Sequence, residues 1–206
     1  VTWYYKGRLD EAEKYLLEAL ANYEKTFQSS WGAYAAAFLG LTYHDRENYG
    51  KANRYHQQCV SIMEDARSFP SWLNCQKLWV KNNKILSGAS DIDIHKLGEL
   101  IKAHEKNRLA MSKSFGSRCI GEIFLHIDDH HMPEAETWIR RSIDLDVKNA
   151  VPWNVGKDYA LYADWFKKKG DIQGAKEQLI KSIDLFKECD ADGWVTRMER
   201  ELAGLT

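Results

Sequence analysis

The chain has 206 residues, and its 44% hydrophobic content is enough to bury a continuous core. Its 29 basic residues nearly balance its 30 acidic residues, which argues against a nucleic-acid footprint or a polybasic membrane patch. The four cysteines form no CxxC pair, and no apolar run or signal pattern indicates a membrane span or export. Reduced thiols and a cytoplasmic location are therefore expected.

Apolar residues recur at helical spacing along the whole chain, and no alternating, strand-like segment appears. Pro70, Pro133 and Pro152 each stand where a helix could begin, and Ser90 and Asp171 are suitable N-caps. The predicted helices are a partial one to about residue 6, then about 8–27, 31–47, 49–67, 71–87, 91–112, 116–129, 133–146, 152–169, 172–189 and 191–204. The first five residues read as the end of a helix, so we expect a fragment of a longer polypeptide.

One pattern of small residues returns about every 40 positions. It has a small residue, a larger one four positions on, and a small one three further on, as in Ala12–Leu16–Ala19, Ala52–His56–Cys59, Ala135–Ile139–Ser142 and Ala175–Leu179–Ser182. A fainter copy at Ile94, Gly98 and Ile101 fills the gap in the series. A fixed period of this length predicts a stack of similar units, here about 1–28 (partial), 29–68, 69–112, 113–148 and 149–190, with a capping helix at 191–205.

The segment Leu39-Gly40, Tyr43, Ala52, His56 and Cys59 resembles the tetratricopeptide repeat at its signature spacings. The resemblance implies one all-α domain over residues 1–206, a right-handed superhelix of antiparallel helix pairs with a C-terminal capping helix. The units are longer than the usual 34 residues. Such long units, and segments such as Asp158–Ala163 and Leu185–Cys189, resemble the repeat tails of large bacterial signalling proteins that carry an adenylate/guanylate cyclase or a signalling ATPase.

The resemblance implies that the first helix of each pair lines a concave groove for a protein or peptide partner. The groove candidates are Tyr34, Phe38, Leu41, Asp45, Gln76, Trp79, Asn83, Phe124, Asp128, Lys157, Asp164 and Lys168. The function expected is a non-catalytic scaffold for protein–protein contact in signal transduction. The alternative is a small-molecule sensor, in which Tyr34, Trp79 and Phe124 would form stacking walls.

No residue pattern indicates an enzyme or a cofactor, and no catalytic or metal-binding residue is predicted. The cluster His126–His131 is rich in imidazoles and carboxylates, yet it falls where a helix should end, so a solvated turn is expected in preference to a zinc site. His56 stands at a large apolar position and is expected to be a core histidine with one bonded ring nitrogen. Self-association is expected through an N-terminal edge formed by Trp3, Tyr4 and Tyr5.

Overall fold

The computed structural model describes residues 1–26, 29–67, 69–88 and 93–205, and within these ranges it contains helices and no strand. This confirms the all-α fold class. The helices are α1 (Thr2–Tyr5), α2 (Leu9–Thr26), α3 (Ser29–His44), α4 (Tyr49–Asp65), α5 (Pro70–Leu86), α6 (Ile94–Glu105), α7 (Ala110–Ile127), the 3-10 turn η1 (Asp129–His131), α8 (Met132–Lys148), α9 (Pro152–Lys169), α10 (Ile172–Glu188) and α11 (Asp192–Ala203).

Helix starts follow the sequence signals closely. Pro70, Pro133 and Pro152 all lie in the first two positions of their helices, where a missing N–H leaves no hydrogen bond unmade. The Asp171 carboxylate accepts from the Gly174 amide at 2.8 Å, which confirms the predicted cap of α10. Ser90 lies outside the described residues, and the cap of α6 is Asp93.

The helix expected over 91–112 is wrong at its end, because α6 stops at Glu105 and α7 already begins at Ala110. The break places Asn107 in the interior, where its side-chain amide lies 3.5 Å from the Ser71 carbonyl oxygen and 3.4 Å from His104 Nδ1. The break between α6 and α7 therefore brings a polar side chain of the loop into contact with α5.

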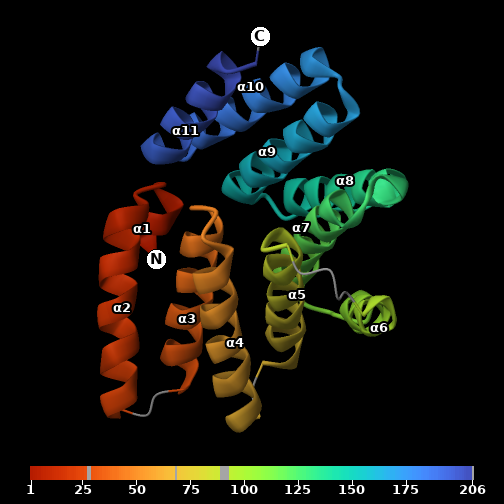
Figure 1. Ribbon diagram of the computed structural model, residues 1–206. Coiled ribbons are helices and arrows are strands. Elements are labelled where there is room, and N and C mark those ends of the chain that lie inside the picture. Colours follow the sequence, from red (N-terminus) through yellow and green to blue (C-terminus); the bar gives the residue numbers. More distant parts are fainter. Residues whose placement is uncertain (27–28, 68, 89–92, 206) are drawn as a thin grey trace. The chain divides into compact units, whose positions relative to one another are not determined.

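The chain divides into two compact units. Unit 1 comprises Val1–Tyr4 and Arg8–Ser112, and unit 2 comprises Tyr5–Gly7 and Lys113–Thr206. In unit 1 each of α2, α3, α4 and α5 packs on the next helix in the chain, and in unit 2 the same holds from α8 to α11 (Figure 1). Consecutive helices packed in this way are consistent with a tetratricopeptide-like helical repeat.

The small residues of the repeat pattern are packing residues. Ala12, Ala52, Ala135 and Ala175 are all fully buried. Ser142 and Ser182 each place a hydroxyl against a carbonyl of the preceding helix, at 3.0 Å from Ser114 O and 2.8 Å from Gly156 O. Such contacts require that the two helices approach closely, which only small side chains permit.

The fainter third copy does not occupy the same positions. Ile94 is 55% exposed, and a Cβ built on Gly98 would meet no atom within 4 Å. The residues that α6 buries are Leu97 and His104 instead. Because these lie on a different stripe of the helix, α6 is rotated relative to the pattern of the other second helices.

Candidate partner-binding site

Helix α3 carries one continuous stripe of larger side chains, which runs on into the turn that follows the helix. Alanines 33 and 35–37 are all buried, so its neighbours approach closely. The stripe runs through Trp31, Tyr34, Phe38, Leu41 and Asp45, at the spacing of one helix face. Four of these five residues were predicted to line the groove, and Trp31 extends the stripe by one turn.

The C-terminal half of this stripe is covered by α1. The Tyr4 hydroxyl donates to Asp45 Oδ2 at 2.8 Å, and its ring meets Phe38 edge-on at 5.4 Å. Phe38 and Leu41 are consequently buried. Tyr4 is only 3% exposed, so this residue of the predicted N-terminal association edge belongs to the core of unit 1.

The N-terminal half of the stripe is exposed. Trp31 is 68% exposed and Tyr34 is 44% exposed, and the Tyr34 ring rests on Phe38 with 4.8 Å between ring centroids. The two aromatic side chains stand three residues apart and therefore lie on the same face of α3. Partly exposed aromatic rings supported by a packed layer are typical contact residues of protein interfaces.

The α5 candidates form a buried polar and aromatic layer. Gln76 Oε1 accepts from Nδ1 of His56 at 2.7 Å, and Asn83 Oδ1 lies 3.0 Å from Nδ1 of His44. Trp79 stacks on His56 and meets His44 edge-on. All three predicted residues are at most 4% exposed. Their role in the structure is to join α3, α4 and α5.

His56 is the core histidine that the sequence predicts, fully buried with one bonded ring nitrogen. Burial lowers its pKa to about 3, so the imidazole is neutral. Three of the four cysteines are also buried, and none of the four forms a disulfide in the described part of the chain. Burial raises the pKa of Cys59 and of Cys75 to about 12, which makes both thiols poor nucleophiles.

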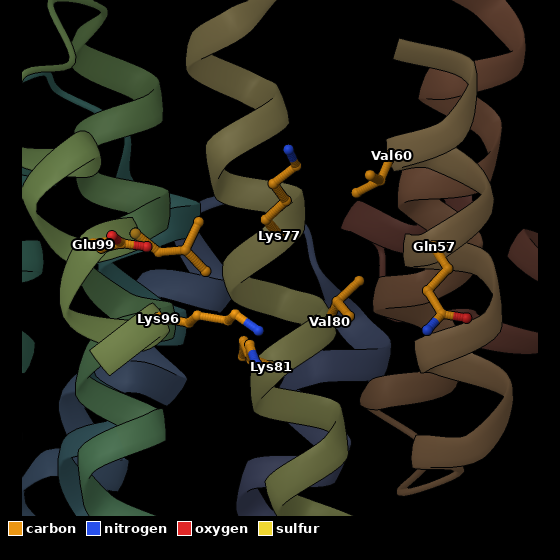
Figure 2. A pocket seen from close by; sticks show the side chains of 8 residues that line it. Gln57, Val60, Lys77, Val80, Lys81, Lys96 and Glu99 are labelled. Carbon is orange, nitrogen blue, oxygen red and sulfur yellow. The ribbon is translucent and has the colours of Figure 1, made fainter. Parts of the chain in front are cut away.

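A cavity of about 430 Å³ opens between α4, α5 and α6 in unit 1 (Figure 2). Apolar side chains and three lysines border it, and the lining residues are Gln57, Val60, Lys77, Val80, Lys81, Lys96, Glu99 and Leu100. None of these residues was predicted as a site. The one feature of the sequence that could have pointed to the cavity is the poor match of the third repeat copy, which lies on α6.

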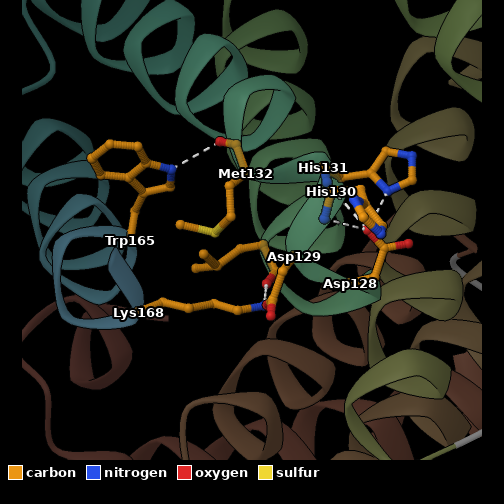
Figure 3. Close-up of polar contacts among 8 residues, drawn as sticks. Asp128, Asp129, His130, His131, Met132, Trp165 and Lys168 are labelled. Atoms are coloured by element: carbon orange, nitrogen blue, oxygen red, sulfur yellow. Dashed lines mark hydrogen bonds and ion pairs between the residues drawn. The ribbon is translucent and has the colours of Figure 1, made fainter. Parts of the chain in front are cut away.

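In unit 2 the predicted residues Phe124 and Asp128 organise the turn after α7. Asp128 caps η1 by accepting from the His130 and His131 amides, and its Oδ1 lies 2.8 Å from His131 Nδ1 (Figure 3). The neighbouring His131 ring lowers the pKa of the Asp128 carboxyl. Phe124 stacks on His131 at 5.4 Å. In the described ranges no group of three or more His, Cys, Asp or Glu residues is placed to hold a metal ion.

The three candidates on α9 all contact neighbouring helices of unit 2. The Lys157 ammonium lies 3.9 Å from the centroid of the Trp194 ring of α11. Asp164 pairs with Lys167, which also donates to Glu201 of α11 at 2.5 Å. Lys168 donates to the Leu125 carbonyl at 2.7 Å and pairs with Asp129 at 3.1 Å, as Figure 3 shows.

Desolvation and the nearby Glu201 and Glu122 carboxylates raise the pKa of Asp164 to about 6, although Lys167 opposes the shift. Asp164 sits at the junction between α9 and the predicted capping helix α11, where the Lys167 pairings link the two helices.

Unit 2 also contains a buried charged network that the sequence did not indicate. Arg118 of α7 lies 3.5 Å from Asp158 of α9, and Asp146 of α8 accepts from Asn154 at 3.2 Å. The Ser142 hydroxyl lies 2.9 Å from Asp158. Both carboxyls are buried, and the second oxygen of each has no hydrogen-bond partner among the described residues. Burial, with Asp146 as a further cause, raises the pKa of Asp158 well above its usual range.

Asp146→Asn is expected to raise the free energy of unfolding at pH 7 by about 1 kcal/mol, the worth of one buried hydrogen bond. The new amide donates to Asp158, which then remains ionised beside Arg118. In the native protein the raised pKa of Asp158 contributes stability below the unfolded-state pKa of about 3.9, and this is lost as pH rises through the folded-state value. Urea unfolding from pH 4 to 8 should show the two proteins diverging as pH rises. A constant difference would contradict the titration of Asp158 as its source.

Comparison with known proteins agrees with this architecture. A family model described as tetratricopeptide repeat matches residues 4–65. This segment holds α2, α3 and α4, and with them the stripe of α3 described above. No curated protein matches the sequence. In the described part of the chain, no helix is both long enough and apolar enough to cross a bilayer. Tetratricopeptide repeats are typically non-catalytic and generally mediate protein–protein contact. Residues 4–65 therefore resemble the tetratricopeptide repeat, and the consecutive packing of the other described helices is consistent with a tetratricopeptide-like helical repeat.

Proposed function

We propose that this chain is a non-catalytic scaffold module, and that its contact surface for a protein or peptide begins at Trp31 and Tyr34. The observation that carries the proposal is the exposure of these two rings on the first helix of the pair that matches the family model. The buried half of the same stripe holds α3 rigidly against α1. A partner would then meet a preformed aromatic surface with little loss of side-chain entropy.

The resemblance to the repeat tails of signalling proteins supports a wider role in signal transduction. In that role the module would be the regulatory repeat region of a larger cytoplasmic protein. Groove contacts by the partly exposed candidates Asp45, Phe124 and Lys157 remain part of the proposal. Self-association would involve Trp3 in preference to Tyr4, because Tyr4 is buried. The Trp3 ring stacks on the exposed Tyr15 ring, with 6.3 Å between the ring centroids.

The alternative role as a small-molecule sensor is supported less well, because the three residues expected to form its stacking walls do not come together in one unit. Trp79 is buried between two histidines, and Tyr34 and Phe124 belong to different units. The cavity of about 430 Å³ is bordered by none of the three. The exposed stripe of α3 therefore favours the protein-binding role.

Trp31→Ala and Tyr34→Ala are each expected to weaken partner binding about tenfold, because interface aromatics commonly contribute more than 1 kcal/mol. The probe is a peptide selected from a random library for binding to the whole chain. Affinities are measured by fluorescence anisotropy of the labelled peptide.

Tyr15→Ala provides the matched control, since Tyr15 is exposed to a similar extent on α2 but lies off the α3 stripe. Its affinity should stay within twofold of the native value. If independently selected peptides bind the Trp31 and Tyr34 variants as tightly as the native chain, the contact surface lies elsewhere. Trp79→Ala is unsuitable for this purpose because it would remove a core side chain.

A further inference from the structure

The cavity of unit 1 is built from one turn of each of three helices. The residues that line it are Gln57 and Val60 of α4, Lys77, Val80 and Lys81 of α5, and Lys96, Glu99 and Leu100 of α6. Val60, Val80 and Leu100 give it apolar walls, to which the methylene stems of the lysines add further apolar surface. A volume of about 430 Å³ falls within the range of about 300–1,000 Å³ typical of small-molecule sites.

The cavity follows from the way in which α6 departs from the repeat. Helix α6 has 12 residues, whereas α4 and α5 have 17 each. It buries Leu97 and His104 instead of the pattern positions, so that the flank bearing Lys96 and Leu100 is turned toward the cavity. The space is thus a consequence of a second helix that does not close on its neighbours as the others do.

The charge around the cavity is predominantly positive. Three of its eight lining residues are lysines, and Glu99 is the one carboxylate among those eight. In Figure 2 the Lys81 and Lys96 side chains point toward one another, and Glu99 stands one turn further along α6 from Lys96. Two further carboxylates stand outside the lining: Glu64 pairs with Lys77 at 2.6 Å, and Asp93 pairs with Lys96 at 3.4 Å.

Asp93 lies near both converging lysines, but it forms an ion pair only with Lys96. The Lys96 amide donates to it at 3.0 Å, and this bond, together with the charges of Lys96 and Lys81, lowers its pKa. Among the described residues Lys81 makes no ion pair within 4 Å. Of the carboxylates near the two ammonium groups, Asp93 and the lining Glu99, only Asp93 pairs with either of them within 4 Å among the described residues, which leaves Lys81 available to a second anion.

We propose that this cavity binds a small carboxylate with an apolar body. The apolar part would lie against Val60, Val80 and Leu100, and the carboxylate would lie between Lys81 and Lys96. The site is independent of the aromatic stripe on α3 and adds a ligand to the protein-binding role.

The dimensions favour a small molecule over a partner helix. Each helix contributes a single turn, about 5.4 Å of its length. A bound helix uses anchors at i, i+3, i+4 and i+7 and needs a groove of at least two turns. A compact ligand of some ten heavy atoms needs only the space that is present.

The test uses octanoate as the probe and octanamide as its uncharged match, with isothermal titration calorimetry on the full chain. Octanoate should bind with one saturable site and octanamide at least tenfold more weakly. Lys81→Gln and Lys96→Gln should each weaken octanoate binding at least fivefold. Lys84→Gln on α5 and Lys102→Gln on α6 are the controls, since both lysines are exposed and neither lines the cavity.

The proposal is overturned if octanoate gives no saturable heat, or if octanamide binds equally well. It is also overturned if the Lys84 or Lys102 variant weakens binding as much as the Lys81 variant. Peptide binding at Trp31 and Tyr34 is measured separately, so failure at either site leaves the result at the other unaffected.

Discussion

Replacing Arg118 by leucine is expected to lower the free energy of unfolding by about 3–5 kcal/mol at pH 7, the cost of breaking a buried ion pair by removing one partner. Arg118 and Asp158 have side chains that are 7% and 0% exposed. Arg118 also donates to the Asn154 carbonyl at 3.3 Å, so its loss leaves a backbone acceptor of α9 without this donor. Urea unfolding followed by far-UV circular dichroism measures the change.

The reason lies in the charge of Asp158. Arg118 is the cation that faces this buried carboxyl, whose pKa burial raises. Without Arg118, Asp158 must either keep its charge in the interior or take up a proton. Since protonation is favoured in acid, the cost of Arg118→Leu should shrink as the pH is lowered toward 4.

Arg140→Leu is the matched control in the same unit. Its guanidinium is 61% exposed and pairs with Glu136 at i and i+4, an arrangement worth about 0.3–0.5 kcal/mol. We expect a loss below about 1 kcal/mol with little dependence on pH. Equal losses for Arg118→Leu and Arg140→Leu would show that burial of the network adds nothing to stability.

The sequence predicted the fold well because the signals that define it are local. Proline placement, the Asp171 cap and the repeated alanines depend on backbone geometry and on close helix approach, which leave a direct trace in residue type. The end of α6 was mispredicted, and the loop that follows it contacts α5 through Asn107 and Ser71, which are 36 positions apart. Such a contact leaves no mark in the helical periodicity.

The candidate site was predictable only as a set of helix faces. Periodicity places Tyr34 and Phe38 on one face of α3, but whether a neighbour covers that face depends on the tertiary contact with Tyr4. For the same reason Gln76 and Asn83 could not be distinguished from exposed polar residues. Their partners, His56 and His44, lie on other helices.

The cavity and the buried charges could not be predicted from the sequence either, because both depend on contacts between helices. Lys81 and Lys96 are ordinary surface residues in a helical pattern, and they converge because α6 is rotated. Arg118 and Asp158 are separated by 40 positions, and no motif in the sequence links them. Long-range convergence of charged residues is a tertiary property that single-sequence periodicity does not contain.

Gly40→Ala is expected to lower the free energy of unfolding by about 2–3 kcal/mol, within the range for overpacking a well-packed core. A Cβ at this position of α3 would lie 2.5 Å from His56 Nε2, far inside van der Waals contact. The His56 ring has no room to retreat, because Trp79 stacks on one face and Gln76 holds its Nδ1. The clash therefore separates α3 from α4 within the segment that matches the family model.

Gly50→Ala is the control, since a Cβ on Gly50 would meet no atom within 4 Å. Alanine exceeds glycine in helix propensity by about 0.8–1 kcal/mol, so this variant of α4 should be as stable as the native chain or more so. The two substitutions are chemically identical and lie ten positions apart, which makes the sign of their difference the decisive result. If Gly40→Ala also stabilises, the close approach of α3 to His56 is not what fixes glycine at this repeat position.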